Sequence, residues 1–226
     1  MRHSEADTIP ELPELDSGVQ LLEAPDRAIG PLHTLVLDTV LRSGHRSAVW
    51  VDAHNYGTSQ YLARVSPTPR VLDRIRIARA FTPYQHQSLI DAAATEVDDD
   101  TALLVIPAVD ALYRTDDVRG AEPQSMLLQT LSKLARYARS ANVPVLLTQE
   151  SEDDFSAPIV QLADGRISVE QTEFGLRFQG SEFETLVYAD GHNTVQTTLA
   201  YWERILAARE PVHQHAHGPE RTVSTA

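Results

Sequence analysis

Residues 101–147 read TALLVIPAVDALYRTDDVRGAEPQSMLLQTLSKLARYARSANVPVLL, with two short apolar runs on either side of a long amphipathic segment. The first run, residues 101–106, is almost continuously apolar, as strands inside parallel sheets tend to be. The middle segment, residues 123–140, carries one apolar helical stripe, made by Met126, Leu127, Leu131, Leu134, Ala135 and Ala138. The second run, residues 143–147, is the next strand. This order predicts two parallel strands joined by a crossover helix.

The same alternation extends toward the N-terminus. Val19–Glu23 and Ala48–Val51 are short apolar runs that suit buried strands, and Gly30–Ser43 between them has apolar residues at helical spacing. Arg74–Ala80 alternates polar and apolar residues as a third strand does. A further helix is expected from Thr82, whose hydroxyl can cap it. The chain up to residue 148 therefore predicts a mostly parallel sheet flanked by helices.

The pattern changes after residue 160, where short strand-like segments are separated by glycine-containing turns. These segments are Arg166–Thr172, Phe174–Gln179, Glu184–Ala189 and Thr194–Leu199. Their spacing predicts an antiparallel meander at the C-terminal end of the domain, followed by a last helix over Tyr201–Arg209.

The two ends of the chain differ from this body in composition. Residues 1–18 are acidic and contain prolines, so we expect an extended arm; residues 19–210 form one domain; residues 211–226 are polar and aperiodic, and we expect a disordered tail. Three histidines alternate in that tail, namely His213, His215 and His217. Because a disordered tail offers them no supporting contacts, we expect no metal site there.

The chain is acidic and uses arginine in place of lysine. It has 19 basic and 32 acidic residues, a net charge of −13, no cysteine, and Lys133 as its one lysine. This composition favours a salt-rich, haloarchaeal cytoplasm, where screening weakens the repulsion between carboxylates; a GC-rich bacterial source is the alternative. No segment approaches the length of a membrane-spanning helix, so we expect a cytoplasmic protein without membrane contact.

Four segments carry a specific resemblance. Residues 71–88 (VLDRIRIARAFTPYQHQS) combine an alternating strand ending in Ala-Arg-Ala with a helix start containing an aromatic residue and glutamines. Residues 50–55 (WVDAHN), 103–114 (LLVIPAVDALYR) and 132–149 (SKLARYARSANVPVLLTQ) are the other three. Together they resemble the RecA/RadA recombinase family, at its catalytic-glutamate strand, Walker B strand and sensor strand. The resemblance implies an α/β RecA-like core with a C-terminal antiparallel meander.

The resemblance also implies a degenerate nucleotide site, made by Pro25, Gly30, Pro31, Leu32, His54 and Pro107. Pro31 and Leu32 stand where the family has the phosphate-binding lysine and the Mg²⁺-binding Ser/Thr, and Pro25 stands at the first glycine of the loop. His54 replaces the glutamate that activates water, and Pro107 replaces the aspartate that orders Mg²⁺. Because each of these parts contributes orders of magnitude in rate, the resemblance implies a pseudo-ATPase with no catalytic residue and no bound cofactor.

Two loops correspond to the DNA-binding loops of the family. The first offers Arg114 and Arg119 among acidic residues, and the second carries Glu152, Asp153 and Asp154 with no base. Direct DNA binding is therefore expected to be weak or absent, since affinity for DNA comes mainly from neutralised phosphates. The acidic loop would either exclude DNA or mimic it. The N-terminal arm also lacks the Phe-x-x-Ala plug by which family members polymerise.

The function expected from these observations is that of a non-catalytic adaptor or regulatory subunit in DNA recombination, repair or replication. Its partner would be a protein, either an active RecA/RadA-type ATPase or another DNA-repair protein. One alternative is a divergent nucleotide-binding ATPase that uses Arg27 for phosphate charge and Asp52 or Asp110 for metal. A regulatory module of the clock or signalling type within the RecA superfamily is a further alternative.

Overall fold

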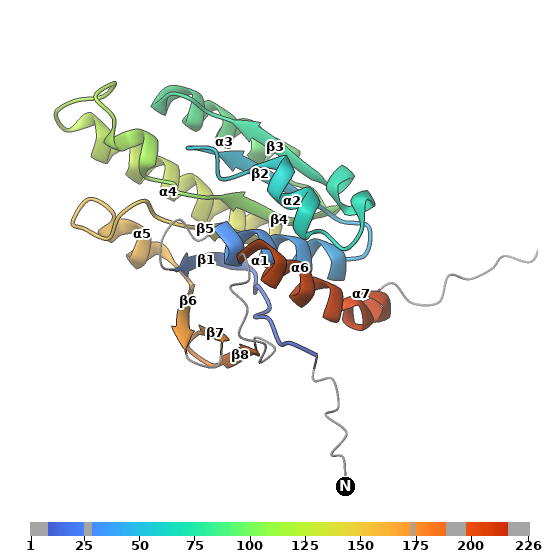
Figure 1. The fold of residues 1–226 in the computed structure, drawn as a ribbon. Helices are drawn as coiled ribbons and strands as arrows, with labels where there is room; N and C mark the ends of the chain where they lie inside the picture. Colours follow the sequence, from blue (N-terminus) through green and yellow to red (C-terminus); the bar gives the residue numbers. More distant parts are fainter. Residues whose placement is uncertain (1–8, 25–28, 173–174, 189–197, 217–226) are drawn as a thin grey trace, which may run out of the picture.

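The computed structural model describes residues 9–24, 29–172, 175–188 and 198–216. These residues form one eight-stranded sheet with the order β3-β2-β4-β5-β1-β6-β7-β8. The first six strands in this order are parallel, and β7 and β8 pair antiparallel to their neighbours. In Figure 1 the antiparallel end of the sheet lies below the layers that contain the helices.

The strands are β1 (Gly18–Glu23), β2 (Ser47–Asp52), β3 (Ile75–Arg79), β4 (Thr101–Ile106), β5 (Pro144–Leu147), β6 (Gly165–Thr172), β7 (Gly175–Gln179) and β8 (Glu184–Tyr188). All six residues of β4 are buried, because helices cover both faces of the sheet at its centre. The strand order brings the carboxyl ends of β2, β4, β5 and β1 to one edge.

The α-helices are α1 (Ile29–Arg42), α2 (Ser59–Val65), α3 (Pro83–Glu96), α4 (Glu122–Ala141), α5 (Ala157–Leu162), α6 (Thr198–Ala208) and α7 (Glu210–Ala216), and the 3₁₀ helices are η1 (Pro69–Arg74) and η2 (Ala111–Arg114). On one face of the sheet, α1, α2 and α6 share an apolar cluster. On the other face, α3, α4 and α5 share a second cluster. Figure 1 shows α6 and α7 lying along α1.

The expected fold class is confirmed: the sheet is mostly parallel, is flanked by helices and ends in an antiparallel set of strands. The predicted cap of α3 is also present, since the hydroxyl of Thr82 accepts a hydrogen bond from the amide of Gln85. The fourth predicted meander strand falls mainly on residues 194–197, outside the described residues. Its last two residues, 198 and 199, begin α6, so the strand prediction is wrong there.

The described parts of the N-terminal arm and the C-terminal tail are more ordered than the sequence indicates. Residues 9–17 contain no helix or strand, as expected of an arm, but Leu12 is buried in the core. Residues 211–216, predicted as part of a disordered tail, belong to α7. The prediction failed because α7 is short and is held by a contact between His213 and α1, which no local pattern reveals. Residues 1–8 and 217–226 lie outside the described part of the chain.

Candidate functional site

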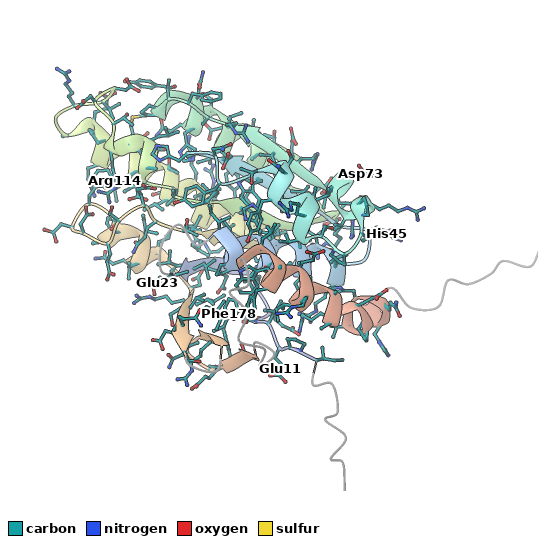
Figure 2. All side chains as sticks on the ribbon, viewed as in Figure 1. Glu11, Glu23, His45, Asp73, Arg114 and Phe178 are labelled. Carbon is teal, nitrogen blue, oxygen red and sulfur yellow. The ribbon has the colours of Figure 1, made fainter. Side chains whose placement is uncertain are left out.

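The carboxyl edge of the sheet is the candidate site, because open α/β sheets bind ligands beyond the carboxyl ends of their strands. Figure 2 shows Glu23, at the end of β1, and Arg114, after β4, at this edge. His45, which precedes β2, and Asp73, which lies in η1 before β3, are at the opposite end (Figure 2).

At the end of β1, two of the residues predicted to form a degenerate phosphate loop are buried in the core. Pro25 and Arg27 lie outside the described residues, whereas Gly30 and Leu32 are buried within α1. A Cβ atom at Gly30 would lie 2.6 Å from Cδ1 of Trp202, the indole that α6 packs against this turn. Gly30 therefore has a packing reason to be glycine. Pro31 removes an amide donor from the same turn.

At the end of β2, a buried carboxylate organises the turn that follows. Asp52 is 0% exposed; its Oδ1 accepts the amide of Gly57 at 2.8 Å and its Oδ2 accepts Nε of Arg79 at 3.0 Å. Arg79 also donates to the carbonyl of Gly57 at 3.0 Å. These contacts fix the turn in which His54 and Asn55 both have positive φ, at 59° and 61°. Such conformations are held only where the surroundings determine them.

His54, which the sequence resemblance places at the family's catalytic glutamate, points toward the strand end of β5. Its Nδ1 lies 3.8 Å from a carboxylate oxygen of Glu150, and 42% of its side chain is exposed. The hydroxyl of Tyr56 donates to the same oxygen over 3.4 Å. The structure thus brings together a histidine, a tyrosine and a glutamate, a cluster that sequence reasoning did not identify.

At the end of β4, Pro107 is buried and the chain turns through Ala108, whose φ is 45°. Thr148 holds this turn, since its hydroxyl accepts the amide of Ala108 at 2.8 Å. The turn carries Asp110 back to the sheet edge, where its Oδ1 accepts the amide of Glu150 at 2.7 Å. Asp110 is 0% exposed. Asp110 therefore lies in the candidate site, although it comes after the end of β4.

Arg114 ties the first loop to the second. Its Nε donates to Asp110 at 2.6 Å, and its terminal nitrogens donate to the two oxygens of Asp153 at 2.7 and 2.8 Å. Its guanidinium also lies 4.7 Å from the ring centre of Phe155. Hydrogen bonds from Arg114 lower the pKa of Asp153, and those to Asp153 raise the pKa of Arg114. The predicted loop residue Arg114 is thus engaged within the chain.

The remaining predicted loop residues face solvent. Arg119, Glu152 and Asp154 are exposed, and Asp153 also accepts the amide of Ser156, the residue before α5, at 3.1 Å. Glu152 and Asp154 follow Glu150, so the second loop presents acidic side chains at the candidate edge. Within the described ranges, no group of three or more His, Cys, Asp or Glu side chains is arranged to hold a metal ion.

An apolar surface adjoins the site at the start of α3. Phe81 is 71% exposed and Tyr84 is 54% exposed, which is unusual for aromatic residues of this size. They line a hollow of about 480 Å³ together with Arg79, Gln85, Ser88 and Leu89. Leu128 on α4 is 45% exposed and lines a different hollow. Sequence reasoning did not single out Phe81, because it directly follows a strand pattern. No helix among the described residues is long and apolar enough to cross a membrane.

Comparisons with known proteins agree with this architecture. Residues 50–169, more than half of the chain, match the family model described as Rad51. The chain belongs to the Rad51 family. The match runs from β2 into β6 and therefore includes the turn after β2, the turn after β4 and both loops, but not β1, α1, α6 or α7.

Its relatives are named recombination and repair proteins. Meiotic recombination protein DMC1 homolog A of Oryza sativa subsp. indica is 33% identical over 132 residues, covering 52% of this chain and 38% of that protein. The human DMC1/LIM15 homolog is 35% identical over 100 residues, covering 42% and 29%. The DNA repair protein RAD51 homolog of Solanum lycopersicum is 31% identical over 116 residues, covering 47% and 34%. The chain spans less than two fifths of the length of these relatives.

Proposed function

We propose that this Rad51-family chain is a non-catalytic adaptor or regulatory subunit that acts in DNA recombination or repair through a protein partner. Its relatives carry the names of recombination and repair proteins, which supports the process. The non-catalytic role rests on the geometry of the candidate site.

One observation carries the proposal: each buried acid at the carboxyl edge is already paired with an arginine of the same chain. Asp52 binds Arg79, and Asp110 binds Arg114. A metal ion at either carboxylate would have to displace a charged partner and the amide that shares the carboxylate. Because the arginine already neutralises the carboxylate, a metal ion there would gain less electrostatic attraction than at a free acid. These pairs therefore oppose the Mg²⁺ chemistry that phosphoryl transfer requires.

Contact with DNA is disfavoured by the same network. The cation nearest the second loop, Arg114, is bound to Asp110 and Asp153, while Glu152 and Asp154 face solvent. A phosphate backbone approaching this edge would meet carboxylates. We therefore propose that DNA is reached through the partner.

The hollow at the start of α3 is the surface we assign to a protein partner. Exposed aromatic side chains such as Phe81 and Tyr84 are enriched in protein interfaces, because they bury much area and lose few rotamers. The partner we propose is an active ATPase of the Rad51 family or another DNA-repair protein. Phe81→Ser should weaken its binding at least tenfold, whereas Leu128→Ser, on α4, serves as the matched surface control.

Calorimetric titration of ATP and Mg²⁺ into the chain in molar KCl tests the non-catalytic role. No heat of binding is expected up to millimolar ATP. Mg²⁺-dependent binding at micromolar concentration, with turnover that Arg27→Ala abolishes, would overturn the proposal in favour of a divergent ATPase. The double variant Asp52→Asn, Asp110→Asn separates the two cases further, because an ATPase that uses these acids for metal would lose turnover in it.

A further inference from the structure

Asp38 lies in the middle of α1, in a helix that is buried along most of its length. It is 2% exposed and binds two residues from the C-terminal end of the chain. Arg209 donates to it from Nε at 2.7 Å and from a terminal nitrogen at 2.9 Å, and His213 Nε2 lies 2.7 Å from its Oδ1. Burial alone would raise the pKa of Asp38, but the hydrogen bonds from His213 and Arg209 outweigh it and lower the pKa.

The N-terminal arm reaches the same cluster through Arg209. Arg209, which follows α6, also donates to the carbonyl of Pro10 in the N-terminal arm at 2.5 Å. A second arm contact lies nearby, where Arg42 at the end of α1 pairs with Glu14. The buried cluster therefore holds α6, α7 and the arm against the same helix. These segments lie outside the part of the chain that matches the Rad51 family.

The two C-terminal helices are held in different ways. α6 buries Trp202, Ile205 and Leu206 in the apolar cluster it shares with α1. In α7, His213 is the buried member of residues 210–215, and the polar residues beside it are exposed. A helix of seven residues is not stable by itself in water, so the attachment of α7 depends on the contact between His213 and Asp38.

We propose that α7 is a latch that opens and closes on α1 as a unit, with Asp38 as its catch, while α6 and the sheet remain folded. Buried ionic contacts contribute little net stability, because desolvation offsets much of their attraction, so closure of α7 is weak. Opening leaves the pair of Asp38 and Arg209 intact, which keeps the charge of Asp38 compensated. The latch thereby exposes the end of α1 without unfolding the domain.

Native-state hydrogen exchange on the full chain tests the latch. The amides of residues 213–216 should be at least 100-fold less protected than those of β4, which exchange through global unfolding. His213→Ala should reduce protection in α7 at least a further tenfold and leave β4 and α6 within twofold. His215→Ala is the matched control, because it makes the same change on the exposed side of the same helix and should leave α7 within twofold.

Asp38→Asn distinguishes a carboxylate that holds both Arg209 and His213 from a contact between His213 and α1 alone. It weakens the hold of Arg209 as well as that of His213, so a glutamate-specific protease should cleave after Glu11 faster than in the His213→Ala variant. If Asp38→Asn does not fold, His213→Ala still decides the question, because it retains the buried ion pair. Equal protection of α7 and β4 in the unmodified chain, or an equal loss in all elements of His213→Ala, would overturn the latch.

Discussion

Lowering the pH from 7.5 to 5 should destabilise the fold by about 4 kcal/mol through two buried histidines. Burial lowers the pKa of His33 to about 4, against a hydrogen bond between its Nδ1 and the carbonyl of Ile29 that raises it. Burial lowers the pKa of His86 to about 4 as well. Both side chains are 0% exposed, so their imidazoles titrate in the folded state only at acidic pH.

The fold loses stability at low pH because unfolding takes up protons there. Each pKa is lowered from 6.5 to about 4, so the unfolded chain binds more protons than the folded chain between these values. The stability is therefore complete above about pH 6.5 and falls as the pH decreases toward 4. At pH 5 each histidine accounts for about 2 kcal/mol of the loss, from the difference between the two titration curves.

Denaturant unfolding followed at pH 7.5, 6.5, 5.5 and 5 measures this dependence. His33→Phe and His86→Phe each remove one titrating group, so each variant should show about half the pH slope whatever its stability at pH 7.5. His215→Gln, at an exposed position of α7, should retain the full slope. A free energy of unfolding that is constant from pH 7.5 to 5, or a slope unchanged in both phenylalanine variants, would refute the reasoning.

Three further predictions concern packing, the acidic loop and salt. Gly30→Ala should destabilise the fold by about 1–3 kcal/mol, since the new methyl group meets the indole of Trp202, and Trp202→Phe should reduce that loss in a double-mutant cycle. Arg114→Gln should release the second loop, which Arg114 holds through its hydrogen bonds to Asp153. A glutamate-specific protease should then cleave after Glu152 at least tenfold faster, and unchanged cleavage would contradict this role of Arg114. With a net charge of −13, the chain should melt at a higher temperature in 2 M than in 0.1 M KCl, whereas a flat or falling Tm would argue against salt adaptation.

Much of the fold was predictable because its signals are local. The apolar run at residues 101–106 coincides with β4, and the amphipathic stripe of residues 123–140 lies within α4. The short helices α2, α5 and α7 were not predicted. Helices of this length depend on tertiary contacts for their stability, and those contacts are invisible in a single stretch of sequence.

The candidate site, like the fold, was predictable only where its sequence signals are local. Departures from a family motif are local in sequence, so those at positions 31, 32, 54 and 107 could be predicted from sequence alone, and they stay predictions. The pairing of Asp52 with Arg79 joins positions 27 residues apart, and that of Arg114 with Asp153 joins positions 39 apart. No spacing rule connects them, because parallel strands place distant segments side by side.

These internal pairs bear on the proposed non-catalytic role of the chain. A site that had merely lost its lysine would leave its acids available for a metal ion, and restoring one residue could restore activity. Here Arg79 and Arg114 neutralise Asp52 and Asp110 from within the chain. We therefore expect that a lysine introduced at position 31 alone would leave both carboxylates paired with their arginines. Under the proposed non-catalytic role, Mg²⁺-dependent ATP hydrolysis should require release of Asp52 or Asp110 as well, and activity from the single substitution Pro31→Lys would show that these pairs do not block the site.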